Sequence, residues 1–244
     1  MFHNMPESKE NIRDNSDKFA DRVIKFNREL SLDGPLPDGI KVMNPFRENP
    51  QALSISKAFY KKFYDDNKPR KMILGINPGR FGAGVTGIPF TDTKRLTGMC
   101  GIDINSGQTH EPSSVFIYKM IDKYGGAQNF YNDYYINSVC SLGFLRKNEK
   151  GNWVNCNYYD YNELLDAVKG FIISSLEKQL GFGIDRSVCF VLGKKNARYF
   201  RHINESEKWF ESLVILDHPR YIEQYKSKQR SKFISEYLAK LTSE

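Results

Sequence analysis

The chain has 244 residues, of which 40% are hydrophobic and 27% are charged. This composition supports a buried core and excludes a fibrous or intrinsically disordered chain. Its 36 lysines and arginines outnumber 29 acidic residues, which leaves a formal charge of +7. Such a surface suits a partner that carries phosphates, but it also suits plain solubility, and both interpretations are open at this point.

No apolar run approaches the roughly 20 residues that cross a bilayer, and the opening MFHNMPESKEN lacks the hydrophobic core of a signal peptide. We therefore expect a cytoplasmic protein that does not interact with membranes. Cys100, Cys140, Cys156 and Cys189 form no CxxC pair. This spacing favours reduced, mostly buried thiols over a metal site.

Helical and extended patterns alternate along the chain. Residues 1–15 are polar and predicted to be loose, whereas residues 16–30 have apolar positions at steps of four, three and four, the pattern of an amphipathic helix. After a turn-rich stretch at 33–39, a second helix is predicted over 51–64. Four short apolar runs predict buried strands at 72–76, 134–139, 188–192 and 213–216, and helices are predicted over 112–124, 163–180, 194–202 and 221–241.

Strands that alternate with helices indicate an α/β fold with a central, mostly parallel four-stranded sheet that helices cover on both faces. We expect one domain over residues 1–244, in which residues 1–65 are a mainly helical N-terminal part. In such a sheet, ligands bind beyond the carboxyl ends of the strands. The segments that follow the strands, from Asn77, Asn137, Gly193 and Asp217 onward, are therefore the candidate site.

The first predicted strand runs into GINPGRFGAGVTGIPF, residues 75–90, with five glycines and two prolines in sixteen residues. This composition cannot continue a strand or a helix, so we predict a long, tightly folded loop whose amides can approach a ligand. Gly82, Gly84 and Gly87 match GxGxxG, but Pro89 follows at once and leaves no helix start to receive a pyrophosphate. A nucleotide-binding enzyme is kept as an alternative.

Two further strand ends carry polar side chains. His218 leaves the last strand and is followed by Pro219, and histidine suits the stabilisation of negative charge near neutral pH. Asn137 lies inside an otherwise apolar strand, where its carboxamide needs hydrogen-bond partners from the backbone or from a ligand. An amide offers a donor and an acceptor side by side, which complements the edge of a pyrimidine.

Taken together, these stretches resemble the single-strand-selective monofunctional (SMUG-type) uracil-DNA glycosylases. Residues 75–90 look like the first motif of that family, Tyr-Ile-Asn at 135–137 like its base-reading strand, and His-Pro at 218–219 like the start of its second motif. The motifs occur in the family's order. The resemblance covers roughly residues 70–220, and the long first motif makes it specific.

The resemblance implies a three-layer α/β/α sandwich that flips a damaged base out of DNA and hydrolyses its glycosidic bond. It implies that Asn77 positions the attacking water, that Phe90 stacks on the base, that Asn137 reads the base edge and that His218 stabilises the departing base. It also implies substrate contacts for Gly75, Ile76, Gly79 and Phe81. No metal or organic cofactor is expected, and we expect a monomer acting on single- or double-stranded DNA that contains uracil.

The sequence departs from the family pattern at several places. The first motif has Arg80 where the family often has proline, and Ala83 where a bulkier residue is usual, so the substrate range at the pyrimidine 5-position is open. After Pro219 the loop differs, and Arg220 and Tyr221 are the candidates for a wedge into the base stack. The predicted phosphate contacts are Arg220, Lys194, Lys226, Lys228 and Arg230, although the tract at 226–232 also fits a solvated helix face.

Two hypotheses of different classes follow from the resemblance. The leading one is a monofunctional uracil-DNA glycosylase of base-excision repair. The alternative is a catalytically inactive protein that binds nucleic acid on the same fold. Both share every binding feature, so only a test of bond cleavage separates them.

Overall fold

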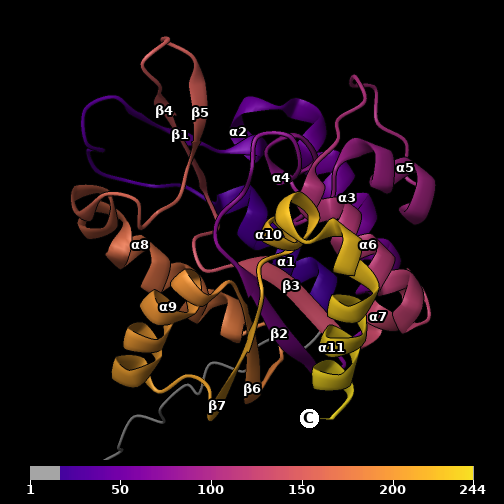
Figure 1. Cartoon of the computed structure of the whole chain (residues 1–244). Coiled ribbons are helices and arrows are strands. Elements are labelled where there is room, and N and C mark those ends of the chain that lie inside the picture. Colours follow the sequence, from indigo (N-terminus) through magenta and orange to yellow (C-terminus); the bar gives the residue numbers. More distant parts are fainter. Residues whose placement is uncertain (1–16, 244) are drawn as a thin grey trace, which may run out of the picture.

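The central sheet consists of four parallel strands, as predicted. In the computed structural model, which describes residues 17–243, the strand order is β3-β2-β6-β7. The strands are β2 (Arg70–Gly75), β3 (Tyr134–Ser138), β6 (Ile184–Leu192) and β7 (Ser212–Leu216). All pairings are parallel, so the four carboxyl ends meet at one edge of the sheet (Figure 1). The predicted loose residues 1–15 lie outside the described residues.

Helices cover both faces of this sheet because neighbouring side chains of a strand point to opposite sides. On one face, Tyr134 packs against Tyr124 and Phe130 and donates a hydrogen bond to the carbonyl of Leu241. These residues belong to or adjoin α6 (Pro112–Tyr124), α7 (Ala127–Asp133) and α11 (Arg230–Thr242). On the other face, Tyr135 packs against α1 (Phe19–Glu29) and α3 (Pro50–Phe63) and bonds to Gln179 of α8 (Asn162–Leu180). The protein is thus a three-layer α/β/α sandwich.

The helix predicted between the last two strands of the main sheet is also present. Helix α9 (Lys194–Glu207) links β6 to β7 and packs against both strands. It runs five residues beyond the predicted end at 202.

All four cysteines are buried and unpaired, as expected, and burial raises the pKa of the Cys100 thiol to about 11. Within the described part of the chain, no helix has the length and apolar character that a bilayer span requires.

The predicted closing helix over 221–241 is wrong, because the structure divides it. A short helix α10 (Pro219–Tyr225) is followed by a 3-10 turn, η1 (Ser227–Gln229), and only then by α11. The 226–232 tract contains no apolar residue. It therefore offers no core contact that would hold one straight helix across the gap.

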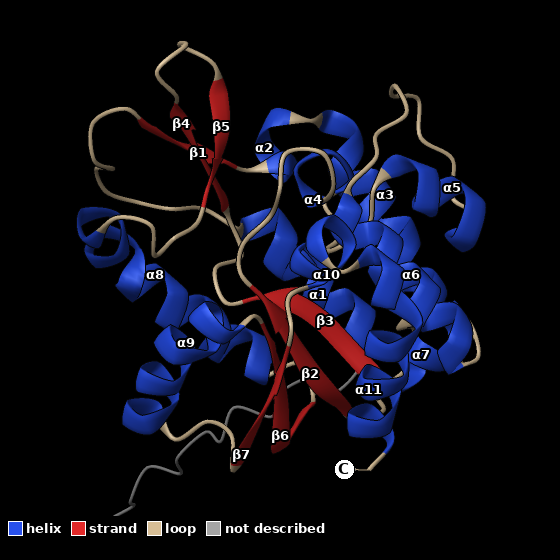
Figure 2. Cartoon of the chain, in the orientation of Figure 1, coloured by secondary structure: helices blue, strands red, loops and turns tan. Residues whose placement is uncertain are grey.

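A second, smaller sheet was not predicted. It contains β1 (Ile40–Met43), β4 (Gly143–Lys147) and β5 (Trp153–Cys156) in the antiparallel order β1-β4-β5. Figure 2 shows it standing beyond the carboxyl edge of the main sheet. Its strands are four or five residues long, and each contains polar residues among its apolar ones, so they lack the apolar runs by which buried strands are found.

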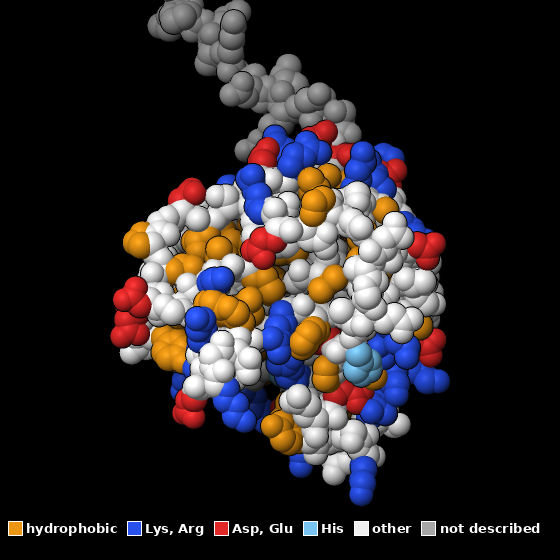
Figure 3. Space-filling model, turned by 90° about the horizontal axis from the view of Figure 1, so that it is seen from above, with side chains coloured by type: hydrophobic (Ala, Val, Ile, Leu, Met, Phe, Trp, Pro, Cys, Tyr) orange, Lys and Arg blue, Asp and Glu red, His pale blue; other side chains and the backbone are white. Residues whose placement is uncertain are grey.

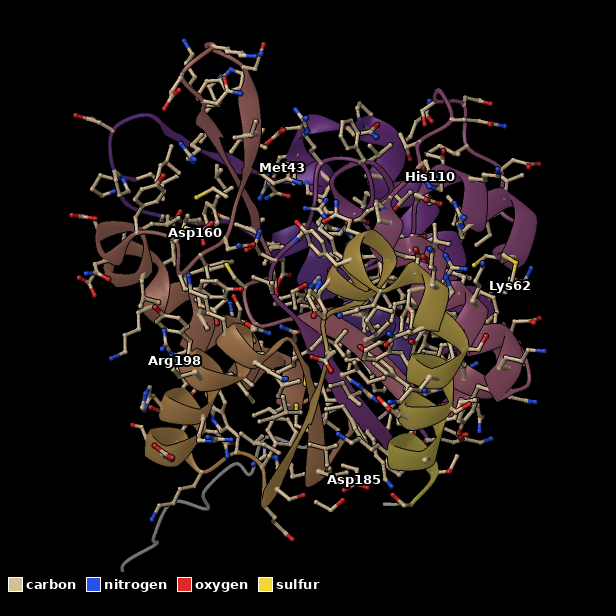
Figure 4. The ribbon with its side chains drawn as sticks, viewed as in Figure 1. Met43, Lys62, His110, Asp160, Asp185 and Arg198 are labelled. Atoms are coloured by element: carbon tan, nitrogen blue, oxygen red, sulfur yellow. The ribbon has the colours of Figure 1, made fainter. Side chains whose placement is uncertain are left out.

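The glycine-rich segment folds against this small sheet. Contrary to the prediction of a loop without helix, residues 75–90 contain a single turn, α4 (Ala83–Thr86), which ends at Gly87 in the left-handed conformation. The Met43 side chain, labelled in Figure 4, fills the space left by missing Cβ atoms at Gly84 and Gly143. Two more unpredicted helices, α2 (Pro45–Glu48) and α5 (Thr93–Cys100), flank the segment.

Candidate active site

A cavity of about 290 Å³ opens at the carboxyl edge of the parallel sheet. Its walls come from the glycine-rich segment, the start of α6, the end of β5 and α10. The lining residues are Ile76, Asn77, Pro78, Gly79, Phe90, Glu111, Ser113, Asn155, Asn157, His218, Arg220, Tyr221, Gln224 and Tyr225. A larger groove of about 590 Å³ runs between α1 and α8 and contains none of the predicted site residues.

Asn77 follows β2 and is held from both ends of its carboxamide. Its Nδ2 donates to the carbonyl of Cys156 at 3.2 Å, and its Oδ1 accepts from the amide of Tyr158 at 3.1 Å. Oδ1 retains a second lone pair that can accept a hydrogen bond. An amide is too weak a base to take a full proton from water, but a fixed amide can orient a water molecule.

His218 follows β7 and caps α10. Its Nδ1 accepts a hydrogen bond from the amide of Arg220 at 3.2 Å, so the ring proton must be on Nε2. Burial lowers the pKa of His218 to about 4, and the positive charge of Arg220 acts in the same direction. At neutral pH the ring is therefore an uncharged imidazole that offers one N–H donor.

Phe90 lies at the end of the glycine-rich segment in an unusual backbone conformation. Its φ is +56°, a region that costs a residue with a side chain about 1–3 kcal/mol. The ring lies directly on Gly75, where a Cβ atom would come within 2.5 Å of it. The ring centre is 6.3 Å from that of His218, with the two planes tilted by 48°. The strained backbone thus holds an aromatic face next to the donor.

Asn137 does not line this cavity. It borders a separate space of about 20 Å³, and Pro78 lines both this space and the larger cavity. Both N–H bonds of its amide are engaged, by the Tyr135 hydroxyl at 2.8 Å and by Gln179 Oε1 at 2.6 Å. Its Oδ1 accepts from the amide of Ser138 at 2.8 Å. One lone pair of that oxygen is left for a ligand.

Glu111 is a site residue that the sequence reasoning missed. It precedes α6 with only 8% of its surface exposed, and its carboxyl oxygens lie against Gly79 and Gly82, where Cβ atoms would collide with them. Burial raises the pKa of Glu111 to about 7, although Arg220 lowers it, and Asp92 contributes to the rise. The only available signal was an acidic residue just before a predicted helix, which is commonplace.

Arg220 and two tyrosines form the outer wall of the cavity. The Nε atom of Arg220 is buried and has no hydrogen-bond partner within residues 17–243. Tyr221 and Tyr225 are 43% and 73% exposed, and their ring centres are 5.8 Å apart. A buried guanidinium N–H without a partner costs free energy, so this position favours an anionic ligand.

The other predicted pocket residues are divided between cavity and surface. Ile76 and Gly79 line the cavity, and Gly75 lies beneath Phe90. Phe81 is absent from the lining and 46% exposed. Its ring stacks instead under the Arg80 guanidinium, 4.5 Å away.

The predicted phosphate contacts differ in their freedom to bind. Lys194 at the start of α9 is exposed, with its Nζ 3.7 Å from Asp217. Lys226 ends α10 half-buried, and Lys228 is exposed in η1. Arg230 donates from Nε to both carboxylate oxygens of the buried Glu223, at 2.7 and 2.9 Å. Its charge is therefore largely satisfied within the protein.

The face above the sheet edge has a mixed surface. Figure 3 shows lysine and arginine side chains interleaved with hydrophobic ones on this face.

Across residues 17–243, no three His, Cys, Asp or Glu side chains are grouped so that they could hold a metal ion. The chemistry available at the cavity is thus an oriented amide, a neutral N–H donor, a buried carboxyl and an arginine.

Comparison with known proteins bears on this arrangement. The family model of the Uracil DNA glycosylase superfamily matches residues 61–242. A crystal structure of wild-type SMUG2 from Pedobacter heparinus superposes with a TM-score of 0.91 and 49% sequence identity, covering 93% of this chain and 97% of that one. No significant match was found among curated proteins. The family match spans most of the chain, including the glycine-rich segment and the His218 turn, and therefore the chain belongs to the uracil DNA glycosylase superfamily.

Proposed function

We propose that this protein is a monofunctional DNA glycosylase that hydrolyses the N-glycosidic bond of uracil in DNA. One observation carries the proposal: a neutral imidazole with its proton on Nε2 shares a cavity with a fixed Asn77 amide and the Phe90 ring. Bond cleavage builds positive charge on the sugar and negative charge on the departing pyrimidine. A donor and an oriented water meet these two needs, and the reaction consumes only water.

His218 would stabilise the charge on O2 of the departing base. A neutral donor suits this step because its hydrogen bond strengthens as charge develops on the acceptor, so it acts mainly on the transition state. A donor in such a position typically contributes about 3–4 kcal/mol. The low pKa of His218 also keeps the donor in one protonation state over the neutral range.

Asn77 would place the attacking water at C1′ of the sugar through the free lone pair of Oδ1. The bonds to Cys156 and Tyr158 fix the amide before substrate arrives, so no ordering cost falls on the reaction step. Glu111, in the same cavity, adds negative charge near the developing oxocarbenium when it is ionised.

Phe90 would bind the flipped base in the cavity, and Asn137 would read the base edge once the base passes Pro78, which lines both the cavity and the small space beside Asn137. Phe90 supplies a stacking surface, which helps to offset the few kcal/mol that base extrusion costs. Asn137 would accept from N3–H with Oδ1 and donate to O4 with Nδ2. Since both N–H groups already have partners, uracil O4 would replace Tyr135 or Gln179 as an acceptor.

The DNA backbone would contact the cations around the cavity mouth. The unpartnered Nε of Arg220 supports a phosphate contact, to which the exposed Lys194 and Lys228 and the half-buried Lys226 add positive charge. Arg230 would contribute little, because Glu223 holds it. Tyr221 and Tyr225 are placed to wedge into the gap that a flipped base leaves.

A uracil-containing oligonucleotide tests the proposal directly. Incubation followed by alkali should break the strand at uracil, whereas incubation without alkali should leave it intact, since the proposed reaction leaves an abasic site. Binding of the oligonucleotide without a break after alkali would refute catalysis and favour the inactive DNA-binding alternative. Binding of free nucleotide without DNA binding would favour a nucleotide-dependent enzyme.

A further inference from the structure

We propose that a basic aromatic strip beside the cavity binds the unpaired DNA strand that flanks the flipped nucleotide. The strip consists of Lys41, Arg80, Phe81, Lys147 and Trp153. It lies on the small antiparallel sheet and the adjoining glycine-rich segment. The inference rests on the proposed function for the identity of the flipped nucleotide, but the strip itself is defined by contacts outside the cavity.

Three members of the strip lie on one face of the small sheet. Lys147 of β4 lies opposite Trp153 of β5. Lys41 of β1 lies opposite Leu145 of β4, which in turn lies opposite Asn155 of β5, two residues after Trp153. Paired residues and those two apart share a face. The contacts agree, because the Nζ atoms of Lys41 and Lys147 are 4.4 and 5.6 Å from the centre of the Trp153 ring.

The strip is continuous with the cavity through Asn155. This residue lines the cavity, and its Oδ1 accepts a hydrogen bond from the amide of Arg80 at 3.2 Å. The Arg80 guanidinium in turn donates to the carbonyl of Trp153 and stacks on the Phe81 ring. Trp153 lies two residues from Asn155 along an extended strand, a separation of about 7 Å. This separation places the ring beside the nucleotides that flank the cavity.

The charge of the strip fits a phosphate backbone. Among residues 17–243, no acidic group lies within ion-pair distance of Lys41, Arg80 or Lys147, and both lysines are exposed. The hairpin from β4 to β5 has a single acidic residue, Glu149, at its tip. Cations interleaved with partly exposed rings are typical of surfaces that bind single strands, in which unpaired bases stack on aromatic side chains. Bases in a duplex already stack on each other, so the rings favour the unpaired strand.

Equilibrium binding of a uracil-free oligonucleotide tests the strip without any cleavage. Trp153→Ala should raise the Kd for the single strand about 5- to 150-fold, the equivalent of one stacked base, and should change duplex affinity much less. Trp153→Phe should restore most of the affinity. Trp153 fluorescence should respond to the single strand in a Trp209→Phe background, which leaves Trp153 as the sole tryptophan.

A charge test does not depend on the tryptophan. Replacing Lys41 and Lys147 together with glutamine should reduce the slope of log K against log salt on single strands by about 1.4, since each lost contact removes about 0.7. Arg146→Gln is the matched control: it removes one charge from the opposite face of β4, where Arg146 lies over Tyr161. That control should keep the parent affinity and slope.

Two results would overturn the inference. One is an unchanged salt slope in the double lysine variant, and the other is a loss in Arg146→Gln as large as in the strip variants. Uracil release by the parent, measured separately with alkali, distinguishes this failure from failure of the proposed function. If the strip variants bind DNA normally while the parent releases uracil, the strand-binding role of the strip is refuted and the proposed glycosylase activity is supported. If the strip variants lose DNA binding while the parent releases no uracil, the strand-binding role is supported and the proposed catalysis is refuted.

Discussion

Substitution of Glu111 by glutamine should stabilise the protein, and only at high pH. Glutamine keeps the size of the side chain and removes its ionisation. Burial raises the pKa of Glu111 from 4.5 to about 7, and each tenfold change in affinity for a proton corresponds to about 1.4 kcal/mol. The folded protein therefore carries about 3 kcal/mol of destabilisation once the carboxyl is ionised.

The direction in which stability changes with pH depends on whether the folded or the unfolded state holds the proton of Glu111. Between about pH 4.5 and 7 the folded state keeps the proton that the unfolded state has lost, so stability falls as pH rises through this window. At about pH 8.5 the glutamine variant should be more stable than the parent by about 3 kcal/mol, and near pH 4.5 the two should differ by less than about 1 kcal/mol.

Urea unfolding of both proteins at the two pH values measures the difference, and groups common to both cancel. A pH-independent difference between parent and variant would refute the assignment of a buried, protonated carboxyl. The same pair of proteins reports on function. If ionised Glu111 favours the positively charged sugar, uracil release by the parent should rise through about pH 7, and Glu111→Gln should lose that step.

Four further predictions concern the proposed reaction and the binding of DNA. Asn77→Ala and His218→Ala should each slow single-turnover uracil release at least about a hundredfold with folding intact, and parental rates in both would remove their assignment. Because the pKa of His218 is about 4, His218→Ala should slow uracil release by the same factor at every pH from about 6 to 9. A reduction in rate confined to acid pH would contradict the neutral imidazole donor. Asn137→Asp exchanges a donor for an acceptor, so the variant should lose uracil and gain cytosine, whose N4 is a donor; full uracil activity would leave Asn137 a structural residue. Replacing Lys226 and Lys228 with glutamine should flatten the salt dependence of DNA binding on all sequences alike and leave the rate at saturating enzyme unchanged, whereas an unaltered slope would identify the tract as a solvated surface.

The sequence by itself determined the α/β class, the four strands of the main sheet and the residues that follow them, although β7 is only partly buried. Apolar runs mark strands buried on both faces, and parallel strands must deliver their carboxyl ends to one edge. Asn77 and His218 could therefore be assigned to one site although 141 positions separate them. The glycine-rich segment between Gly75 and Phe90 supplied the family resemblance because so many glycines and prolines are rare outside a specific backbone path.

Only the tertiary structure decided the features that depend on neighbours distant in the chain. Glu111 has an ordinary position before a helix, and its raised pKa arises from burial by the protein packed around it and from Asp92, against the opposing effect of the Arg220 charge. The protonated atom of His218 follows from a backbone amide in α10. The small sheet exists because Met43 and its neighbours find partners about a hundred residues away, a pairing that no local pattern records. Periodicity reports how each segment is buried, whereas charge state, tautomer and non-local pairing depend on which segments meet, and that is fixed by packing of the whole chain.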